Sequence, residues 1–237
     1  MEVPSLKLVL DRIIVRRLSW SLTASGIFEP GIHLISGDIG SGKSTLSLLM
    51  AGLNPPEQGS VIHEGIGSIL VSFQFPEFHV TGRSVAEECI SWGFEPETIL
   101  RQAGVGVVPE VPVLSLSRGE LKRLLLTCIL SRNCDLLLLD EPFSSLDCPA
   151  KMDICRQISR RTSGITVIFS HEQSIFPAID HLWEINDGTL ADCGRMPQGL
   201  LHWQHVPPLV RRLIETGRIP ESLTPEGLQE AACRIRD

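Results

Sequence analysis

The sequence lacks several features that would point to particular classes of protein. No apolar run approaches the roughly 18 residues that a membrane-spanning helix needs, although 43% of the 237 residues are hydrophobic. The start of the chain, 1–4, has neither a basic segment nor an apolar run, so we expect no cleavable signal. Any role at a membrane is therefore predicted to be peripheral, through a partner.

Concentrated positive charge and paired cysteines are also absent. The net charge is −7, and short pairs such as Arg16-Arg17 and Arg160-Arg161 do not build a basic stripe, which disfavours nucleic-acid binding. The seven cysteines are odd in number and include no CxxC, so free thiols in a reducing cytosol are expected. A metal site built from them is the alternative.

Continuous apolar runs predict a parallel α/β core, since strands covered on both faces need no polar alternation. The expected strands are 6–17, 18–22, 32–36, 65–73, 136–139 and 165–169. The expected helices are 45–51, 84–92, 96–103, 117–132, 150–161, 209–216 and 222–234. We predict a nucleotide-binding core of 1–73 and 133–195, a mostly helical insertion at 74–132 and a helical C-terminal extension at 196–237, in a single domain.

The segment after the expected strand 32–36 fits the Walker A pattern G-x-x-x-x-G-K-S. Its glycines let backbone amides face phosphates, Lys43 can reach the outer phosphates, and the Ser44 hydroxyl can bind Mg²⁺. A chance glycine loop is the alternative, but the strand before it and the helix after it favour phosphate binding. The candidate ATP-binding residues here are Gly37, Asp38, Ile39, Gly40, Ser41, Gly42, Lys43, Ser44 and Thr45.

Two adjacent carboxylates end the apolar run 136–139. Such a pair is costly at the end of a buried strand unless it has a function. Asp140 is suited to holding Mg²⁺ through water, and Glu141 to polarising the attacking water. The alternative is a strand that ends in a solvated turn.

Four weaker signals lie elsewhere along the chain. Ser117 and Glu120 have the spacing of a helix capping box, which is a structural explanation by itself, although that helix N-terminus could also face a phosphate. Gln74, which ends an expected strand, could bind the metal or hold the water. His171 could donate to the γ-phosphate, and Asp147 could reach a second subunit.

Taken together, these motifs resemble those of the ATP-binding subunits of ABC transporters, over nearly the whole chain. Segment 116–120 resembles the signature motif of that family, Gln74 its Q-loop, 144–147 its D-loop and His171 its switch histidine. The resemblance implies a P-loop NTPase (RecA-like) core, an N-terminal antiparallel β portion and a helical ABC-type subdomain. It also implies that Ser117, Gly119 and Asp147 meet ATP held by a second subunit.

A narrower resemblance is to importers of the energy-coupling-factor and cobalt type. Segments 73–77, 85–88 and 207–228 are similar to theirs. The resemblance implies an ATPase at the cytoplasmic face of the membrane, paired with an identical or different ATPase subunit. A membrane coupling subunit and a substrate-capture subunit would complete it, for a transition metal ion (cobalt or nickel) or a vitamin. The alternatives are a soluble ABC ATPase outside transport and a regulatory subunit with impaired turnover.

The chain departs from the family pattern at two places. Arg118 stands where glycine is usual and Glu120 where glutamine is usual, which makes unequal composite sites a possibility to test. No tyrosine occurs, so few aromatic residues are available to stack on adenine. Trp20 is a candidate, but its expected position in a strand favours a core role.

Overall fold

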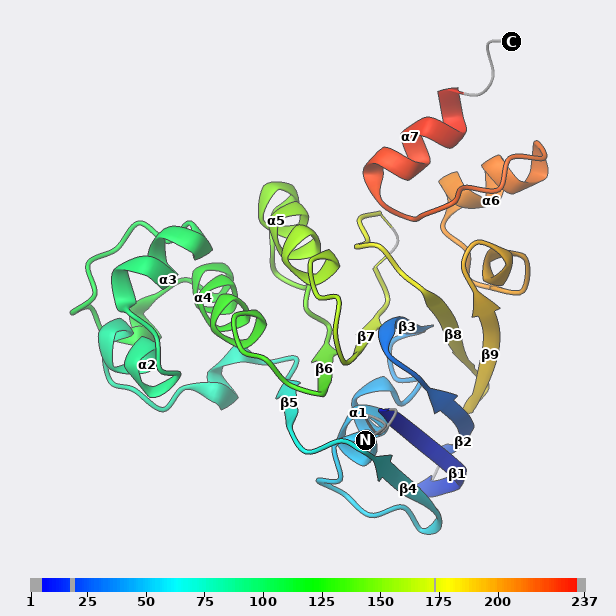
Figure 1. Cartoon of the computed structure of the whole chain (residues 1–237), viewed down its shortest axis with the longest axis horizontal. Coiled ribbons are helices and arrows are strands. Elements are labelled where there is room, and N and C mark those ends of the chain that lie inside the picture. Colours follow the sequence, from blue (N-terminus) through cyan, green and yellow to red (C-terminus); the bar gives the residue numbers. More distant parts are fainter. Residues whose placement is uncertain (1–5, 18–19, 173, 234–237) are drawn as a thin grey trace, which may run out of the picture.

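The computed structural model describes residues 6–17, 20–172 and 174–233. Within these ranges nine strands form one sheet in the order β4-β1-β2-β9-β8-β3-β7-β6-β5. The predicted α/β class with a mixed sheet is confirmed (Figure 1). Parts of two predicted elements, 18–19 and 234, lie outside the described residues.

The five strands from β8 to the edge strand β5 form the parallel part of the sheet. It contains β3 (Gly31–Gly37), β5 (Ile69–Ser72), β6 (Leu136–Asp140), β7 (Ile165–Ser170) and β8 (His181–Asn186), of which β6 and β7 are buried at every residue. Helix α1 (Lys43–Met50) packs on one face with Leu136 and Leu138. Helix α5 (Cys148–Ser159) packs on the other with Leu137 and Leu139. The carboxyl ends of β3, β6 and β7 consequently meet at one edge of the sheet.

Three strands that pair antiparallel to a neighbour were not predicted from the sequence: β4, β8 and β9. β1 (Lys7–Arg17) pairs with β2 (Trp20–Phe28) and with β4 (Gln58–Glu64), and β8 pairs with β9 (Thr189–Arg195). Strand β4 is mostly exposed and has little apolar alternation, so the expected strand 65–73 was drawn too long and β4 was missed. The β8–β9 hairpin turns at Asp187 and Gly188, with φ of 46° and 71°, which suits a primed hairpin turn.

The insertion forms a separate helical lobe beside the β5–β6 end of the sheet (Figure 1). It holds α2 (Val85–Ser91), α3 (Pro96–Ala103) and α4 (Arg118–Leu130), whose apolar residues build their own cluster. A short 3₁₀ turn, η1 (Pro76–His79), leads into the lobe. As predicted, the segment between Gln74 and Arg132 is mainly helical.

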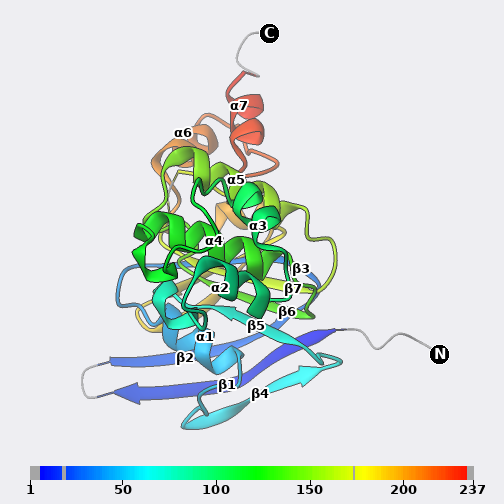
Figure 2. The same cartoon turned by 90° about the vertical axis from the view of Figure 1, so that its left-hand side faces the viewer.

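The C-terminal segment contains α6 (Pro208–Glu215) and α7 (Pro225–Cys233). Val210, Leu213 and Leu228 join the apolar cluster on the α5 face of the sheet. Figures 1 and 2 both show these helices at the end of the molecule opposite β1, β2 and β4. This segment is folded into helices, as its composition indicates. The proposed subdivision of the chain at residue 196 stays a prediction.

Candidate functional site

The glycine-rich loop 37–42 connects the end of β3 to the first turn of α1. Gly40 and Gly42 have φ angles of 85° and 105°, in the left-handed region that glycine adopts without the steric penalty of a Cβ. Gly42 is the N-cap of α1 and has no side chain that could cap it. The first-turn amides therefore point outward as donors, and the helix dipole adds to their preference for an anion such as phosphate.

Lys43 places a buried positive charge in this loop. Its side chain is 6% exposed, and its Nζ donates to the carbonyl oxygens of Gly37 at 2.7 Å and Asp38 at 2.9 Å. The same Nζ lies 3.6 Å from Oε1 of Glu141. The ammonium thus joins the phosphate loop to the end of β6, where a bound phosphate would lie within its reach.

Asp140 and Ser44 form the part of the site that fits a cation. Asp140 is the buried last residue of β6, and its carboxylate is hydrogen-bonded to the Ser44 side chain. Burial raises the pKa of Asp140, and the bond to Ser44 offsets part of that rise. Among the described residues, Asp140 Oδ1 has no hydrogen-bond partner. A buried, unpartnered carboxylate oxygen beside a hydroxyl is the donor set that Mg²⁺ prefers.

Glu141 is held in a strained backbone conformation with its carboxylate inside the site. Its φ is 48°, which is rare for a residue other than glycine, and its side chain is buried. Oε1 lies 2.7 Å from Nδ1 of the half-exposed His171, and Oε2 accepts a hydrogen bond from Ser170 Oγ at 3.3 Å. The end of β7 therefore aims the carboxylate between His171 and Lys43.

A cavity of about 360 Å³ opens in front of these groups. It brings together many of the sequence-predicted site residues and adds two others. The lining residues are Arg17, Trp20, Ile39, Gly40, Gly42, Lys43, Ser44, Thr45, Gln74, Glu141 and His171. Of the remaining loop residues, Asp38 has a side chain that is 82% exposed, in agreement with the expectation that it points outward.

The core role that the sequence favoured for Trp20 is confirmed in part. The ring packs partly on the core but also lines the cavity, and a Cβ built on Gly42 would lie 2.2 Å from its Cζ2 atom. The reason is its position as the first residue of β2, at the edge of the sheet where the phosphate loop turns. The sequence signal for a strand was correct, but it does not tell an end of a strand from its middle.

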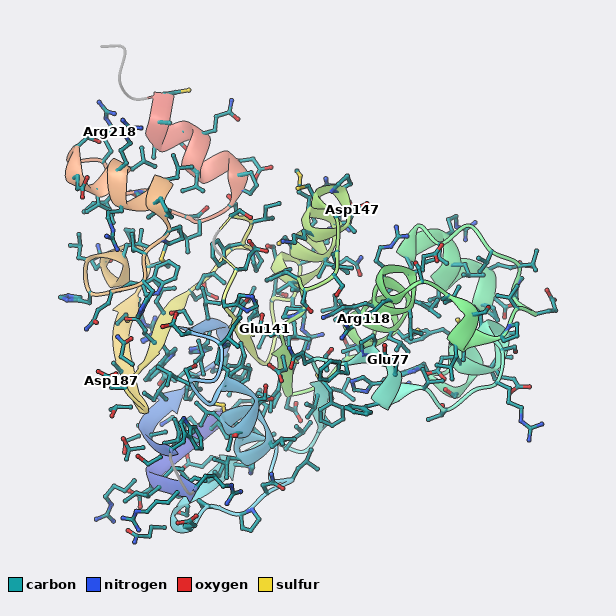
Figure 3. The ribbon with its side chains drawn as sticks, turned by 180° about the vertical axis from the view of Figure 1, so that it is seen from behind. Glu77, Arg118, Glu141, Asp147, Asp187 and Arg218 are labelled. Carbon is teal, nitrogen blue, oxygen red and sulfur yellow. The ribbon has the colours of Figure 1, made fainter. Side chains whose placement is uncertain are left out.

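The structure does not bring Ser117, Gly119 or Asp147 to this cavity. Ser117 caps α4 through the predicted capping box with Glu120, and Asp147 Oδ1 caps α5 by accepting from the Ala150 amide at 2.9 Å. Figure 3 shows Arg118, the neighbour of Ser117, on the helical lobe and Asp147 beside α5, both apart from Glu141. Ser117 and Asp147 thus have structural roles within the chain, and the roles of all three residues toward a second subunit stay predictions.

Arg118 is turned toward the entrance of the helical lobe. The centre of its guanidinium lies 5.0 Å from the ring centroid of Phe75, and its Nε lies 3.8 Å from the Glu77 carboxylate. Glu77 and Arg118 lie next to each other in Figure 3. The residue that departs from the family pattern thus holds the start of α4 against the segment that follows Gln74.

Sequence reasoning missed the buried Lys122 on α4, which is 2% exposed. Its Nζ donates to the main-chain oxygen of Glu141 and to Ser144 Oγ. Burial lowers the pKa of Lys122 to about 8. Arg118, Glu120 and Arg123 lie close to Lys122 in the sequence, so this part of the helix reads as charged and exposed and gives no local signal that Lys122 is buried.

Known proteins resemble this chain over most of its length. Residues 24–144 match the family model described as ABC transporter. The chloroplastic ABC transporter I family member 11 of Arabidopsis thaliana is 30% identical over 202 residues, covering 71% of this chain and 72% of that protein. The energy-coupling factor transporter ATP-binding protein EcfA2 of Thermotoga maritima is 28% identical over 230 residues, covering 84% of this chain and 86% of that protein.

The fold is shared with a solved structure, a putative ABC transporter ATP-binding protein from Pyrococcus furiosus. It superimposes with a TM-score of 0.61 at 21% identity, over 76% of this chain and 97% of that one. Across the described part of this chain, no helix combines the length and apolar character needed to cross a bilayer. The matched family model and the relative at 30% identity show that the chain belongs to the ABC transporter family, as an ATP-binding subunit with ATPase activity.

Proposed function

We propose that the chain is the ATP-binding subunit of an energy-coupling-factor type importer and hydrolyses ATP at the interface of a dimer. The observation that carries the hydrolytic part is the convergence of Lys43, Ser44, Glu141 and His171 on one cavity at the carboxyl edge of the parallel strands, with Asp140 next to Ser44. This edge is where ligands of open α/β sheets bind. The set supplies a phosphate cradle, a metal ligand and a carboxylate base.

Each residue then has a defined role in hydrolysis. The amides of 37–45 and the Lys43 ammonium hold the phosphates, and Mg²⁺, when bound to Ser44, Asp140 and Gln74, would neutralise their charge. Glu141 accepts the proton of the attacking water, and His171, hydrogen-bonded to Glu141, stands ready to donate to the γ-phosphate. Gln74 lines the same cavity, and its side-chain amide would orient that water. Trp20, at the cavity wall, is the proposed platform for adenine.

Residues outside the cavity are proposed to complete the site of a second subunit. Ser117 and Gly119 begin α4 on the helical lobe, and Asp147 begins α5. ABC ATPase subunits work as dimers with membrane components, and in the proposed dimer these residues face the nucleotide on the partner. The partner is an identical or a different ATPase subunit. The following test addresses the role of Arg118 in closing the dimer.

Replacing Arg118 with glycine is expected to raise ATP turnover up to about fivefold. The contact of Arg118 with Phe75 and Glu77 holds the start of α4 inside its own chain, and closing onto a partner would have to loosen it. An exposed cation–π contact of this kind is worth about 1 kcal/mol, which corresponds to about fivefold in rate. Phosphate release and nucleotide-dependent dimerisation are the measurements, with Arg118→Lys as the control that keeps the charge. Unaltered turnover and dimerisation would show that Arg118 has no functional meaning.

The importer part of the proposal rests on the similarity to a relative named as an energy-coupling factor ATP-binding protein. The cargo would be a transition metal ion, cobalt or nickel, or a vitamin, held by a separate capture subunit. The chain would lie at the cytoplasmic face, on a membrane coupling subunit. A soluble ABC ATPase outside transport is the second candidate, and the net charge of −7 disfavours a nucleic-acid partner for it.

Isolation of the tagged chain from its own host tests this assignment. An integral membrane protein is expected to co-purify with the chain in mild detergent. Phe78, 74% exposed on η1 beside Gln74, is proposed to contact that subunit, so Phe78→Ser should reduce the recovery about tenfold while basal ATP turnover is kept. Leu209→Ser, at a residue 55% exposed on α6, is the matched control. Recovery of the chain only with soluble partners would favour the second candidate.

A further inference from the structure

Lys122 connects the helical lobe to the loops that carry the proposed catalytic groups. The residue belongs to α4, which begins at the lobe side with the Ser117 cap. Its Nζ donates to the main-chain oxygen of Glu141, to Ser144 Oγ at 2.6 Å and to the main-chain oxygen of Gln74 at 3.5 Å. One buried ammonium therefore bonds to segments that follow β5 and β6 and precede α5.

These bonds act on the strained part of the Glu141 backbone. The carbonyl of Glu141 accepts from Lys122 Nζ and also from Ser144 Oγ at 3.0 Å. On its other side, the Glu141 amide donates to the carbonyl of Phe169 at 2.8 Å. A residue with φ of 48° persists only when its surroundings fix it from several directions. The hydrogen bond from Lys122 is one of these constraints, and it comes from a helix of the lobe.

A packing role alone does not account for a lysine at this position. The side chain is 2% exposed, and an apolar residue at this position would avoid the cost of burying a charge. The acceptors of Lys122 are main-chain oxygens and a hydroxyl, all from the segments that border the catalytic cavity. The buried charge is therefore directed at the geometry of those segments.

We propose that Lys122 is a positioning residue that fixes the backbone of Glu141 and makes the aim of its carboxylate depend on the position of α4. The inference rests on the proposed role of Glu141 as the base for hydrolysis. A displacement of the helical lobe moves the ammonium relative to the Glu141 carbonyl, and the carboxylate then loses its alignment with His171 and Lys43. Hydrolysis is thereby coupled to lobe position through a contact within one chain.

Replacement of Lys122 by methionine in the full chain tests this inference. The value of kcat for ATP hydrolysis is expected to fall between about tenfold and 100-fold, the range for a misplaced catalytic group. The Kd of a fluorescent ATP analogue should stay within about twofold, since Lys122 does not line the cavity and the phosphate loop is untouched. Lys122→Arg should restore most of kcat because the guanidinium also donates to oxygens. Arg123→Met, next on the same helix, is the matched control and should leave kcat unchanged.

Ser144→Ala gives a second test that keeps the buried ammonium in place and removes only one of its acceptors. It also removes one of the three donors to the Glu141 carbonyl, which accepts in addition from Lys122 Nζ and from the Ser144 amide, and should lower kcat about threefold, the effect of one neutral hydrogen bond. An unchanged kcat in the methionine or the alanine variant would overturn the inference. So would a loss of ATP binding equal to the loss of kcat, because that would indicate general structural damage. Glu141→Gln, measured alongside, tests the role of Glu141 separately: normal turnover there would refute the catalytic assignment and not the contact of Lys122.

Discussion

Glu141→Gln is expected to lower kcat for ATP hydrolysis by at least about 100-fold, since a positioned general base contributes between about 100-fold and 10,000-fold. Glutamine has the same shape but cannot accept the proton of the attacking water. Oε1 of Glu141 lies 2.7 Å from His171 Nδ1 and 3.6 Å from Lys43 Nζ, so the carboxylate is already aimed into the cavity. Phosphate release at saturating ATP measures the effect.

The same variant should keep the Kd for ATP within a few-fold. The phosphates are proposed to rest on the loop amides and Lys43, none of which the substitution removes. Glu172→Gln is the matched control, because Glu172 follows the neighbouring strand β7 but pairs with Lys151, away from the cavity lining. Normal turnover of Glu141→Gln would refute the catalytic role. Loss of ATP binding would instead assign Glu141 to holding Lys43 in place.

The parts of the fold that the sequence predicted share a simple physical cause. Strands β3, β6 and β7 are buried on both faces, so most of their residues are apolar and indicate buried strands without further context. The ends of these strands carry Gly37, Asp140 and Ser170, and parallel pairing brings those ends to one edge. The Walker A motif and the two carboxylates were therefore enough to predict that the phosphate loop and Glu141 meet at the cavity.

The elements that were missed depend on contacts that are not local. Strand β4 has mostly exposed residues and is fixed by pairing with β1, and the hairpin of β8 and β9 carries its main signal in the turn at Asp187-Gly188. Lys122 is similar in this respect. Its partners Gln74 and Glu141 lie 48 and 19 residues away along the chain, and no local pattern indicates that they share one ammonium.

Lys43→Met is expected to weaken ATP binding between about tenfold and 150-fold, which corresponds to the roughly 1.5–3 kcal/mol of a hydrogen bond to a charged group. Methionine keeps much of the buried aliphatic stem, so the change removes mainly the charge and its donors. The ammonium now donates to the carbonyls of Gly37 and Asp38 and lies near Glu141, all within the phosphate loop or facing it. Binding of a fluorescent ATP analogue, titrated with and without Mg²⁺, measures the loss.

Lys151→Met is the matched control. Lys151 lies on α5, pairs with Glu172 and does not line the cavity, so the variant should have an unchanged Kd for ATP. An unchanged Kd in Lys43→Met would mean that the phosphates do not rest on this loop. Measured together, the two variants separate binding from chemistry. Glu141→Gln should bind ATP without hydrolysing it, whereas Lys43→Met should lose both. If both variants lost binding equally, the 3.6 Å pair of Lys43 and Glu141 would be a structural unit and the division of roles between them would be wrong.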